Sequence, residues 1–186
     1  MRPLLLLLLR AGLLLGLLVA VAACPASGGG PRGTTPPSPA GPTVALLDGA
    51  ADLDGQPVGP LAAGQRATSA IVFASWCGAC RDEIVVLDEL RATHPDVRLL
   101  GVNYRAHEEY DGRGDAAAVR AFVATHAPWL RVVPADEAMW GQLGRPPKVP
   151  TLYVFDRTGA LARTFDRRHD PLPTRADLEA ALAALP

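Results

Sequence analysis

Two cysteines separated by two residues occupy the point where an apolar, β-type stretch gives way to a helical pattern. The stretch at 70–74 precedes the pair, and apolar residues at helical spacing follow over 81–94. The N-terminus of a helix carries about half a positive charge and several unpaired N–H groups, and both favour a thiolate. We therefore expect Cys77 to ionise readily and to act as a nucleophile. Cys80 lies about one turn further along and could attack a mixed disulfide on Cys77, so the pair predicts a thiol–disulfide exchange site.

The composition leaves few other uses for this pair. The 186 residues include only three cysteines, too few for a disulfide-stapled scaffold, and one Cys-x-x-Cys supplies half of the four ligands of a closed zinc site. The four histidines show no ligand spacing with the pair. A structural disulfide or half of a metal site is therefore the weaker alternative, and we expect no metal and no cofactor. The net charge of -1 gives no indication of nucleic-acid binding.

Residues 1–23 have the pattern of a signal peptide. Arg2 and Arg10 form a short basic region, and an apolar stretch follows over 11–22. An uncleaved membrane anchor over 3–23 is the competing interpretation, because about 20 apolar residues can span a bilayer. Arg10 counts against the anchor, since a charge within a membrane span is costly.

The end of this segment resembles the lipobox of bacterial lipoproteins. Residues 21–23 supply one aliphatic and two small residues before Cys24, the cysteine that would be acylated and become the new N-terminus. An ordinary secretory signal with an incidental cysteine is the alternative. Residues 24–42 are rich in Pro, Gly, Ser and Thr and are expected to form an extended tether. We therefore expect a periplasmic, lipid-anchored protein of the bacterial cell envelope, with its folded domain at 43–186.

Residues 43–186 show alternating strand and helix patterns, which predict a central β-sheet with helices on both faces. An apolar stretch at 43–47 and turn residues at 54–57 predict a small N-terminal β-hairpin. Asp115 is the expected N-cap of the second helix. The expected strands are 70–74, 97–102, 131–133, 151–155 and 160–165, and the expected helices are 81–94, 115–125 and 174–185.

Three segments together resemble the TlpA/ResA-type membrane-tethered thiol–disulfide oxidoreductases of the thioredoxin superfamily. They are Phe-Ala-Ser-Trp-Cys-Gly-Ala-Cys-Arg-Asp-Glu at 73–83, Gly-Val-Asn at 101–103, and Val-Pro-Thr-Leu-Tyr-Val-Phe-Asp at 149–156. The resemblance covers about residues 44–186. It implies an α/β, thioredoxin-like fold with a central mixed β-sheet flanked by helices, extended at its N-terminus by the hairpin.

The resemblance also implies roles for individual residues. Cys77 is the expected nucleophile and Cys80 the resolving cysteine, and the two form the redox disulfide. Pro150 is the expected cis-proline of the catalytic site, where a cis bond would expose the backbone of Val149 to an extended substrate strand. The other residues expected to contact substrate are Trp76 and Thr151.

Glu83 follows Cys80 by one turn and falls on the same side of the predicted helix. In the resembling family a glutamate at this position lies close to the cysteines and influences their protonation, so Glu83 is a candidate to accept the proton of Cys80. The alternative is a solvated acid of the first helical turn, which the helix dipole favours. Ile71 stands where thioredoxins carry a buried aspartate, and this favours Glu83 as the base.

The chain departs from the family pattern at four places. Val85 stands where the family often has proline, and the dipeptide at 78–79 is Gly-Ala rather than a pair containing proline. The glycine usual after the last strand is absent at 166–168. The segment 104–115 is rich in charge and glycine and has the character of an insertion. The last two departures leave the substrate-facing surface unassigned.

The family implies a reductase of disulfides in exported proteins, with apocytochrome c or copper-site assembly proteins as substrates. Its electron donor would be a membrane thiol-transfer protein, and we expect a monomer. The alternative is a copper-delivery module that binds Cu(I) through Cys77 and Cys80. A thiol peroxidase would need a cysteine flanked by Pro and Thr ahead of a distant resolving cysteine, and the sequence has no such pattern. The intact cysteine pair argues against a redox-inert domain.

Overall fold

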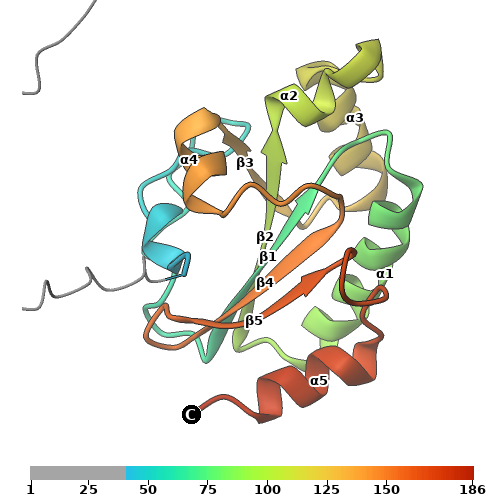
Figure 1. The fold of residues 1–186 in the computed structure, drawn as a ribbon. Helices are drawn as coiled ribbons and strands as arrows, with labels where there is room; N and C mark the ends of the chain where they lie inside the picture. The colour runs from blue at the N-terminus through green and yellow to red at the C-terminus, as the bar shows by residue number, and fades with distance from the viewer. Residues whose placement is uncertain (1–40) are drawn as a thin grey trace, which may run out of the picture. The chain divides into compact units, whose positions relative to one another are not determined.

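A five-stranded mixed β-sheet forms the centre of the computed structural model, which describes residues 41–186 (Figure 1). The strand order is β3-β2-β1-β4-β5. Strands β1, β2 and β3 are parallel to one another, and β4 runs antiparallel to β1 and to β5. The strands are β1 Ala67–Phe73, β2 Val97–Tyr104, β3 Arg131–Ala135, β4 Thr151–Asp156 and β5 Leu161–Asp166.

Helices cover both faces of this sheet, as the alternating pattern predicts. The helices are α1 Gly78–Thr93, α2 Arg105–Glu108, α3 Ala116–His126, α4 Glu137–Gln142 and α5 Arg175–Ala183, with 3-10 turns η1 Val44–Leu46 and η2 Tyr110–Gly112. Apolar residues of α1, α3 and α5 share one buried cluster with one side of the sheet, and those of η1 and α4 share a second cluster with the other side. The side chains of β1 alternate between them, with Ile71 and Phe73 in the first cluster and Ala70 and Val72 in the second. Because β1 is buried on both faces, its second half, 70–73, is a continuous apolar run in the sequence.

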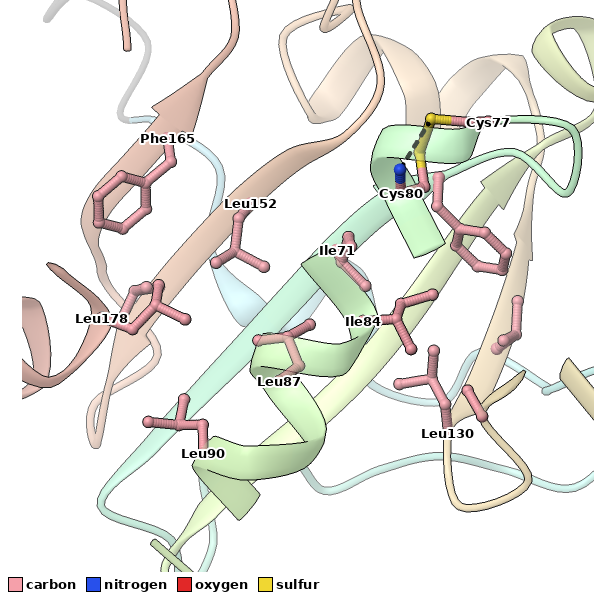
Figure 2. Packing of buried hydrophobic residues seen from close by; sticks show 14 of the residues in the cluster. Ile71, Cys77, Cys80, Ile84, Leu87, Leu90, Leu130, Leu152, Phe165 and Leu178 are labelled. Atoms are coloured by element: carbon pink, nitrogen blue, oxygen red, sulfur yellow. Dashed lines mark hydrogen bonds between the residues drawn. A yellow bond between two sulfur atoms is a disulfide. The ribbon is translucent and has the colours of Figure 1, made fainter. Parts of the chain in front are cut away.

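Helix α1 carries the cysteine pair at its N-terminus and packs along the sheet by its apolar face. Ile84, Leu87 and Leu90 recur at helical spacing, and each is at most 1% exposed (Figure 2). The helix ends at Thr93, before Pro95, which disfavours helical backbone in the residue that precedes it. This packing fixes the direction in which the helix presents its first turn.

The predicted N-terminal β-hairpin is wrong. The stretch at 43–47 forms the turn η1, and the loop that follows is closed only by an isolated bridge between Ala51 and Pro57. Val44, in η1, and Leu47, which follows it, are both buried and are three positions apart, a spacing that suits a helical turn and not a strand. Asp52 organises the turn itself, because its carboxylate accepts hydrogen bonds from the N–H groups of the residues at 54 and 56, at 3.0 and 2.8 Å.

The start of the described chain is attached to the turn between β4 and β5. Thr43 forms an antiparallel bridge with Ala160, and the N–H of Val44 donates to the carbonyl of Gly159 at 2.9 Å. Among residues 41–186, no helix is both long enough and apolar enough to cross a membrane. The predicted signal peptide, Cys24 and all but the last two residues of the predicted tether lie outside the described residues.

The other predicted elements are present, with bounds that differ from the predicted ones by at most three residues. Asp115 is the N-cap of α3, as expected, and its carboxylate accepts from the N–H of Ala118 at 2.8 Å. Two short helices, α2 and α4, occur where the sequence analysis expects none. Helix α2 lies in the segment 104–115 that departs from the family pattern, directly after β2.

Candidate active site

Cys77 and Cys80 form a disulfide at the N-terminus of α1, immediately beyond the end of β1. Their Cα atoms are 5.2 Å apart. Cys77 is the N-cap of the helix and is 7% exposed, whereas Cys80 is 0% exposed (Figure 2). The N–H of Cys80 donates to the Sγ of Cys77 at 3.1 Å. Of the pair, only Cys77 has any exposed surface, and a thiolate formed there would gain a hydrogen bond and the helix dipole.

Glu83 is buried on α1 one turn after Cys80. It is 1% exposed, and neither oxygen of its carboxylate has a hydrogen-bond partner. Burial without a partner disfavours the charged form, and it raises the pKa of Glu83 from 4.5 to about 7. The solvated alternative is therefore wrong, because the apolar face of α1 carries this carboxylate into the core. A group whose pKa is raised toward neutral pH therefore lies on the same side of the helix as Cys80.

The loop before β4 lies beside the cysteine loop because of the strand register. Thr151 pairs with Val72 across the β1–β4 ladder, so Pro150 is next to the point where β1 ends. The Val149–Pro150 peptide bond is cis, as the resemblance implies. Thr151 is buried, and its hydroxyl donates to the carbonyl of Lys148 at 2.8 Å. Val149 is half-buried beside it.

The segment 104–115 is joined to the cysteine loop by a buried carboxylate. Glu108 is 1% exposed and accepts hydrogen bonds from the backbone N–H of Ser75 at 2.9 Å and from Nδ2 of Asn103 at 2.8 Å. It also accepts from the hydroxyl of Ser75. The indole N–H of Trp76 donates to the carbonyl of Glu108 at 3.0 Å. Gly114 completes the contact, since a Cβ there would overlap the Glu108 carboxylate.

Through this network, Glu108 of α2 holds Ser75 and Trp76, the two residues just before Cys77. Every donor that faces the Glu108 carboxylate comes from the end of β1 or the end of β2. Within the described residues, no group of three or more histidine, cysteine, aspartate or glutamate side chains could hold a metal ion.

Solved structures with a similar fold include several that are remote in sequence. A secreted disulfide oxidoreductase of Mycobacterium tuberculosis, homologous to E. coli DsbE, superposes with a TM-score of 0.58 and 22% identity, covering 75% of this chain and 97% of that one. A thioredoxin-like protein of Aeropyrum pernix gives a TM-score of 0.62 and 14% identity, covering 76% and 91%. The chain has a thioredoxin-like fold. StoA of Bacillus subtilis is similar too, with a TM-score of 0.56, 19% identity and coverage of 71% and 92%. No protein-family model and no curated protein matches the sequence.

The thioredoxin-like fold brings most of the sequence-predicted site residues to one end of the sheet. The cysteine loop and the first turn of α1 supply Trp76, Cys77, Cys80 and Glu83, and the loop before β4 supplies the segment 149–151. Cys24 lies outside the described residues.

Sequence reasoning missed Glu108 and its partners Ser75 and Asn103. A signal for the two partners is present in the sequence, because both are polar and both follow apolar stretches that form neighbouring parallel strands. The carboxyl ends of such strands meet at one edge of a sheet, where sites commonly form. The sequence holds no comparable signal for Glu108. Its side chain is brought to these strand ends by helix α2, which begins directly after β2.

Proposed function

We propose that the protein is an extracytoplasmic thiol–disulfide oxidoreductase that reduces disulfides in exported proteins through Cys77 and Cys80. The observation that carries this proposal is the difference between the two sulfurs. The accessible Cys77 caps a helix N-terminus, and its disulfide partner Cys80 is buried one turn before the partnerless carboxylate of Glu83. The secreted disulfide oxidoreductase from M. tuberculosis, which shares the fold, adds support for this class of activity.

The reaction begins from the reduced pair. The Cys77 thiolate attacks one sulfur of a substrate disulfide, and the other substrate sulfur leaves as a thiolate with the electron pair of the broken bond. Cys77 and the substrate are then joined by a mixed disulfide. The Cys80 thiolate attacks the Sγ of Cys77 and expels the second substrate sulfur. Two electrons have moved from the protein to the substrate, which becomes a dithiol while the protein pair becomes a disulfide.

Glu83 has a part in the second step. Cys80 is 0% exposed, so its thiol cannot pass its proton directly to bulk water. Glu83, whose pKa is raised to about 7, can accept this proton as Cys80 becomes a thiolate, and it can return the proton when the disulfide is reduced again. Cys80 and Glu83 are then never negatively charged at the same time, a state that the low dielectric of the core would oppose.

The proposed setting follows from the sequence. Acylated Cys24 would hold the chain at a membrane surface on the periplasmic side, as a monomer, with residues 24–42 as the tether. A membrane thiol-transfer protein would supply the two electrons that return the Cys77–Cys80 disulfide to the dithiol. Apocytochrome c and copper-site assembly proteins are the proposed substrates.

The reduction potential tests the direction of electron flow. The full chain, purified in a neutral detergent, is equilibrated in glutathione and dithiothreitol redox buffers, and alkylation of free thiols measures the reduced fraction. A potential near that of thioredoxin, about −270 mV, is the expected result for a reductase that draws electrons from a membrane donor. A potential near that of DsbA, about −120 mV, would make the protein an oxidant and overturn the proposed direction.

A further inference from the structure

A groove of about 340 Å³ lies between the segment 104–115 and the loop before β4. Trp76 lines it on the side of the cysteine loop, and Val149 lines it beside Pro150. Because these two residues adjoin Cys77 and the loop that lies beside the end of β1, a chain bound at the cysteines would have its flanking residues in this groove. We call it the Trp76 groove.

Three of the eight residues that line the Trp76 groove carry a positive charge. Arg113, Lys148 and Arg167 line it, all three are exposed, and no aspartate or glutamate is among the lining residues. Lys148 is the single lysine of the chain. His107 also lines the groove, and burial lowers its pKa, so at neutral pH it adds little charge.

These three cations differ from others nearby in having no carboxylate partner among residues 41–186. Arg105 pairs with Glu109 and Arg145 pairs with Glu137, and both pairs lie outside the groove lining. The acids closest in sequence to the groove cations are Asp111 and Asp115, each two residues from Arg113, and Asp166, next to Arg167. None of the three lines the groove.

Asp166 is already engaged by two of its own neighbours. Its carboxylate contacts Arg168 at 3.6 Å and His169 at 3.3 Å. The positive charge of the Trp76 groove is therefore not neutralised by the described part of the chain.

Two of the three groove cations, Arg113 and Arg167, are held by contacts that leave their charge available. The guanidinium of Arg113 lies 5.0 Å from the ring centre of Trp76 and 5.6 Å from that of Tyr110. Arg167 donates to the carbonyl of Val149 at 3.4 Å. Stacking on aromatic rings orders a guanidinium without using its in-plane donors, which can then meet a carboxylate. Tyr110, at 62% exposed, adds apolar surface for the rest of a bound segment.

We propose that the Trp76 groove binds an acidic side chain that flanks the reacting cysteine of the substrate, so that the protein prefers disulfides in acidic polypeptide segments. This inference rests on the proposed function, because it specifies the substrate class of the same site. The argument is charge complementarity beside the nucleophile, where an aspartate or glutamate of the substrate supplies the partner that the chain does not.

Single-turnover kinetics test this preference. The full chain, purified in a neutral detergent and reduced beforehand, reacts with three peptide disulfides that differ only in Glu, Gln or Lys beside one cysteine. Each rate is divided by the rate of the same peptide with dithiothreitol, which removes the intrinsic effect of the charge on the disulfide. We expect the normalised rate for Glu to exceed that for Gln about five-fold at low ionic strength, and that for Lys to be lowest. The preference is expected to disappear at about 1 M salt, where the Debye length is about 3 Å.

Charge-removing variants locate the effect. Arg113→Gln, Lys148→Gln and Arg167→Gln are each expected to lower the Glu preference about two-fold, and the triple variant to abolish it. The matched control is Arg157→Gln, the same change of charge in the turn between β4 and β5, at the opposite end of β4. Reaction with the small neutral hydroxyethyl disulfide should stay unchanged in all of them, which also reports that they fold.

A binding measurement separates this inference from the proposed function. Oxidised protein is titrated into fluorescent peptides in which serine replaces the cysteines and the flanking residue is Glu or Gln, and anisotropy gives the affinity. Tighter binding of the Glu peptide supports the groove assignment, whether or not a disulfide is reduced. Failure to reduce any disulfide would instead overturn the proposed function. Equal binding and equal rates for Glu and Gln, with hydroxyethyl disulfide still reduced, would overturn the groove assignment alone.

Discussion

Glu108 accepts a hydrogen bond from the backbone N–H of Ser75, two residues before Cys77, at 2.9 Å. This bond joins α2 to the loop that carries Trp76 and Cys77. Because the carboxylate accepts only, it suits a position faced by three donors, from the backbone and hydroxyl of Ser75 and the amide of Asn103. The segment 104–115 is thus part of the support of the active site.

The first prediction concerns this support. Glu108→Gln would turn an N–H₂ group toward one of those donors and leave a buried polar group without a partner. We expect the free energy of unfolding to fall by about 1–3 kcal/mol, measured by urea denaturation of the oxidised protein. Glu109→Gln, a neighbouring exposed residue paired with Arg105, is the control and should change stability by less than about 0.5 kcal/mol. Equal losses in the two variants would contradict the role of Glu108.

The second prediction separates the two cysteines. Cys80→Ser should let Cys77 form a mixed disulfide with a peptide disulfide and then stop, because no sulfur remains to resolve it. The trapped species is visible as a mass increase of the protein that a reductant reverses. Cys77→Ser should form almost none, since the remaining sulfur is 0% exposed. Comparable trapping by both variants would reverse the assigned order of attack.

The third prediction is a pH dependence of stability caused by Glu83. Its pKa is about 7 in the folded protein and 4.5 ordinarily, so between these values the folded state holds a proton that the unfolded state has lost. The free energy of unfolding should therefore fall as pH rises from 4.5 through 7, by about 3 kcal/mol from this group. Denaturation of the oxidised wild type and of Glu83→Gln at several pH values measures it. The difference between the two proteins should grow in favour of the variant as pH rises, and a constant difference would show that the pKa is not raised.

The fourth prediction is a pH dependence of the resolving step. In the wild type, release of substrate from the mixed disulfide should accelerate as Glu83 loses its proton, with a midpoint near pH 7. In Glu83→Gln the midpoint should move upward, toward the pKa of about 8.5 of an ordinary thiol or beyond. Quenched-flow separation of the mixed disulfide gives both profiles. If the variant is slower by the same factor at every pH, Glu83 does not act as the proton acceptor.

The fifth prediction concerns packing beneath the site. A Cβ at Gly101, in β2, would lie 2.8 Å from Cγ2 of Val132 and 2.9 Å from Cε1 of Phe73. Gly101→Ala should therefore lower the free energy of unfolding by about 1–3 kcal/mol. Gly141→Ala, in α4, meets only the end of the Arg145 side chain at 3.7 Å and should raise stability by about 0.5–1 kcal/mol. Thermal unfolding measures the stability of both variants. A Gly101→Ala protein more stable than Gly141→Ala would contradict the prediction.

Local pattern predicted those parts of the molecule that local chemistry determines. The apolar run of β1, the spacing of Ile84, Leu87 and Leu90, and Pro95 after α1 together place the cysteine pair at a helix N-terminus. The N-cap of α3 at Asp115 was predictable in the same way. The cis form of the bond before Pro150 was not, since only the family resemblance pointed to it.

The features that the sequence could not predict depend on burial, or on contacts between residues far apart in the chain. The sequence gives Glu83 two possible environments, and the packing of α1 against the sheet selects the buried one. The hairpin prediction failed because the apolar stretch at 43–47 buries residues three apart, Val44 and Leu47, once it meets the second cluster. Glu108 was missed because its partners come from two strand ends that meet only in the folded sheet.

The bridge between Thr43 and Ala160 fixes the end of the sheet at which the described chain begins. Strand β4 begins at the active-site loop and ends at the turn that Thr43 contacts, so the chain enters the sheet at the end opposite Cys77 (Figure 1). Six residues of strand separate the two ends by about 20 Å. Anything that holds the protein by the residues before Thr43 would therefore turn the redox sulfurs outward, toward molecules that arrive from the opposite side.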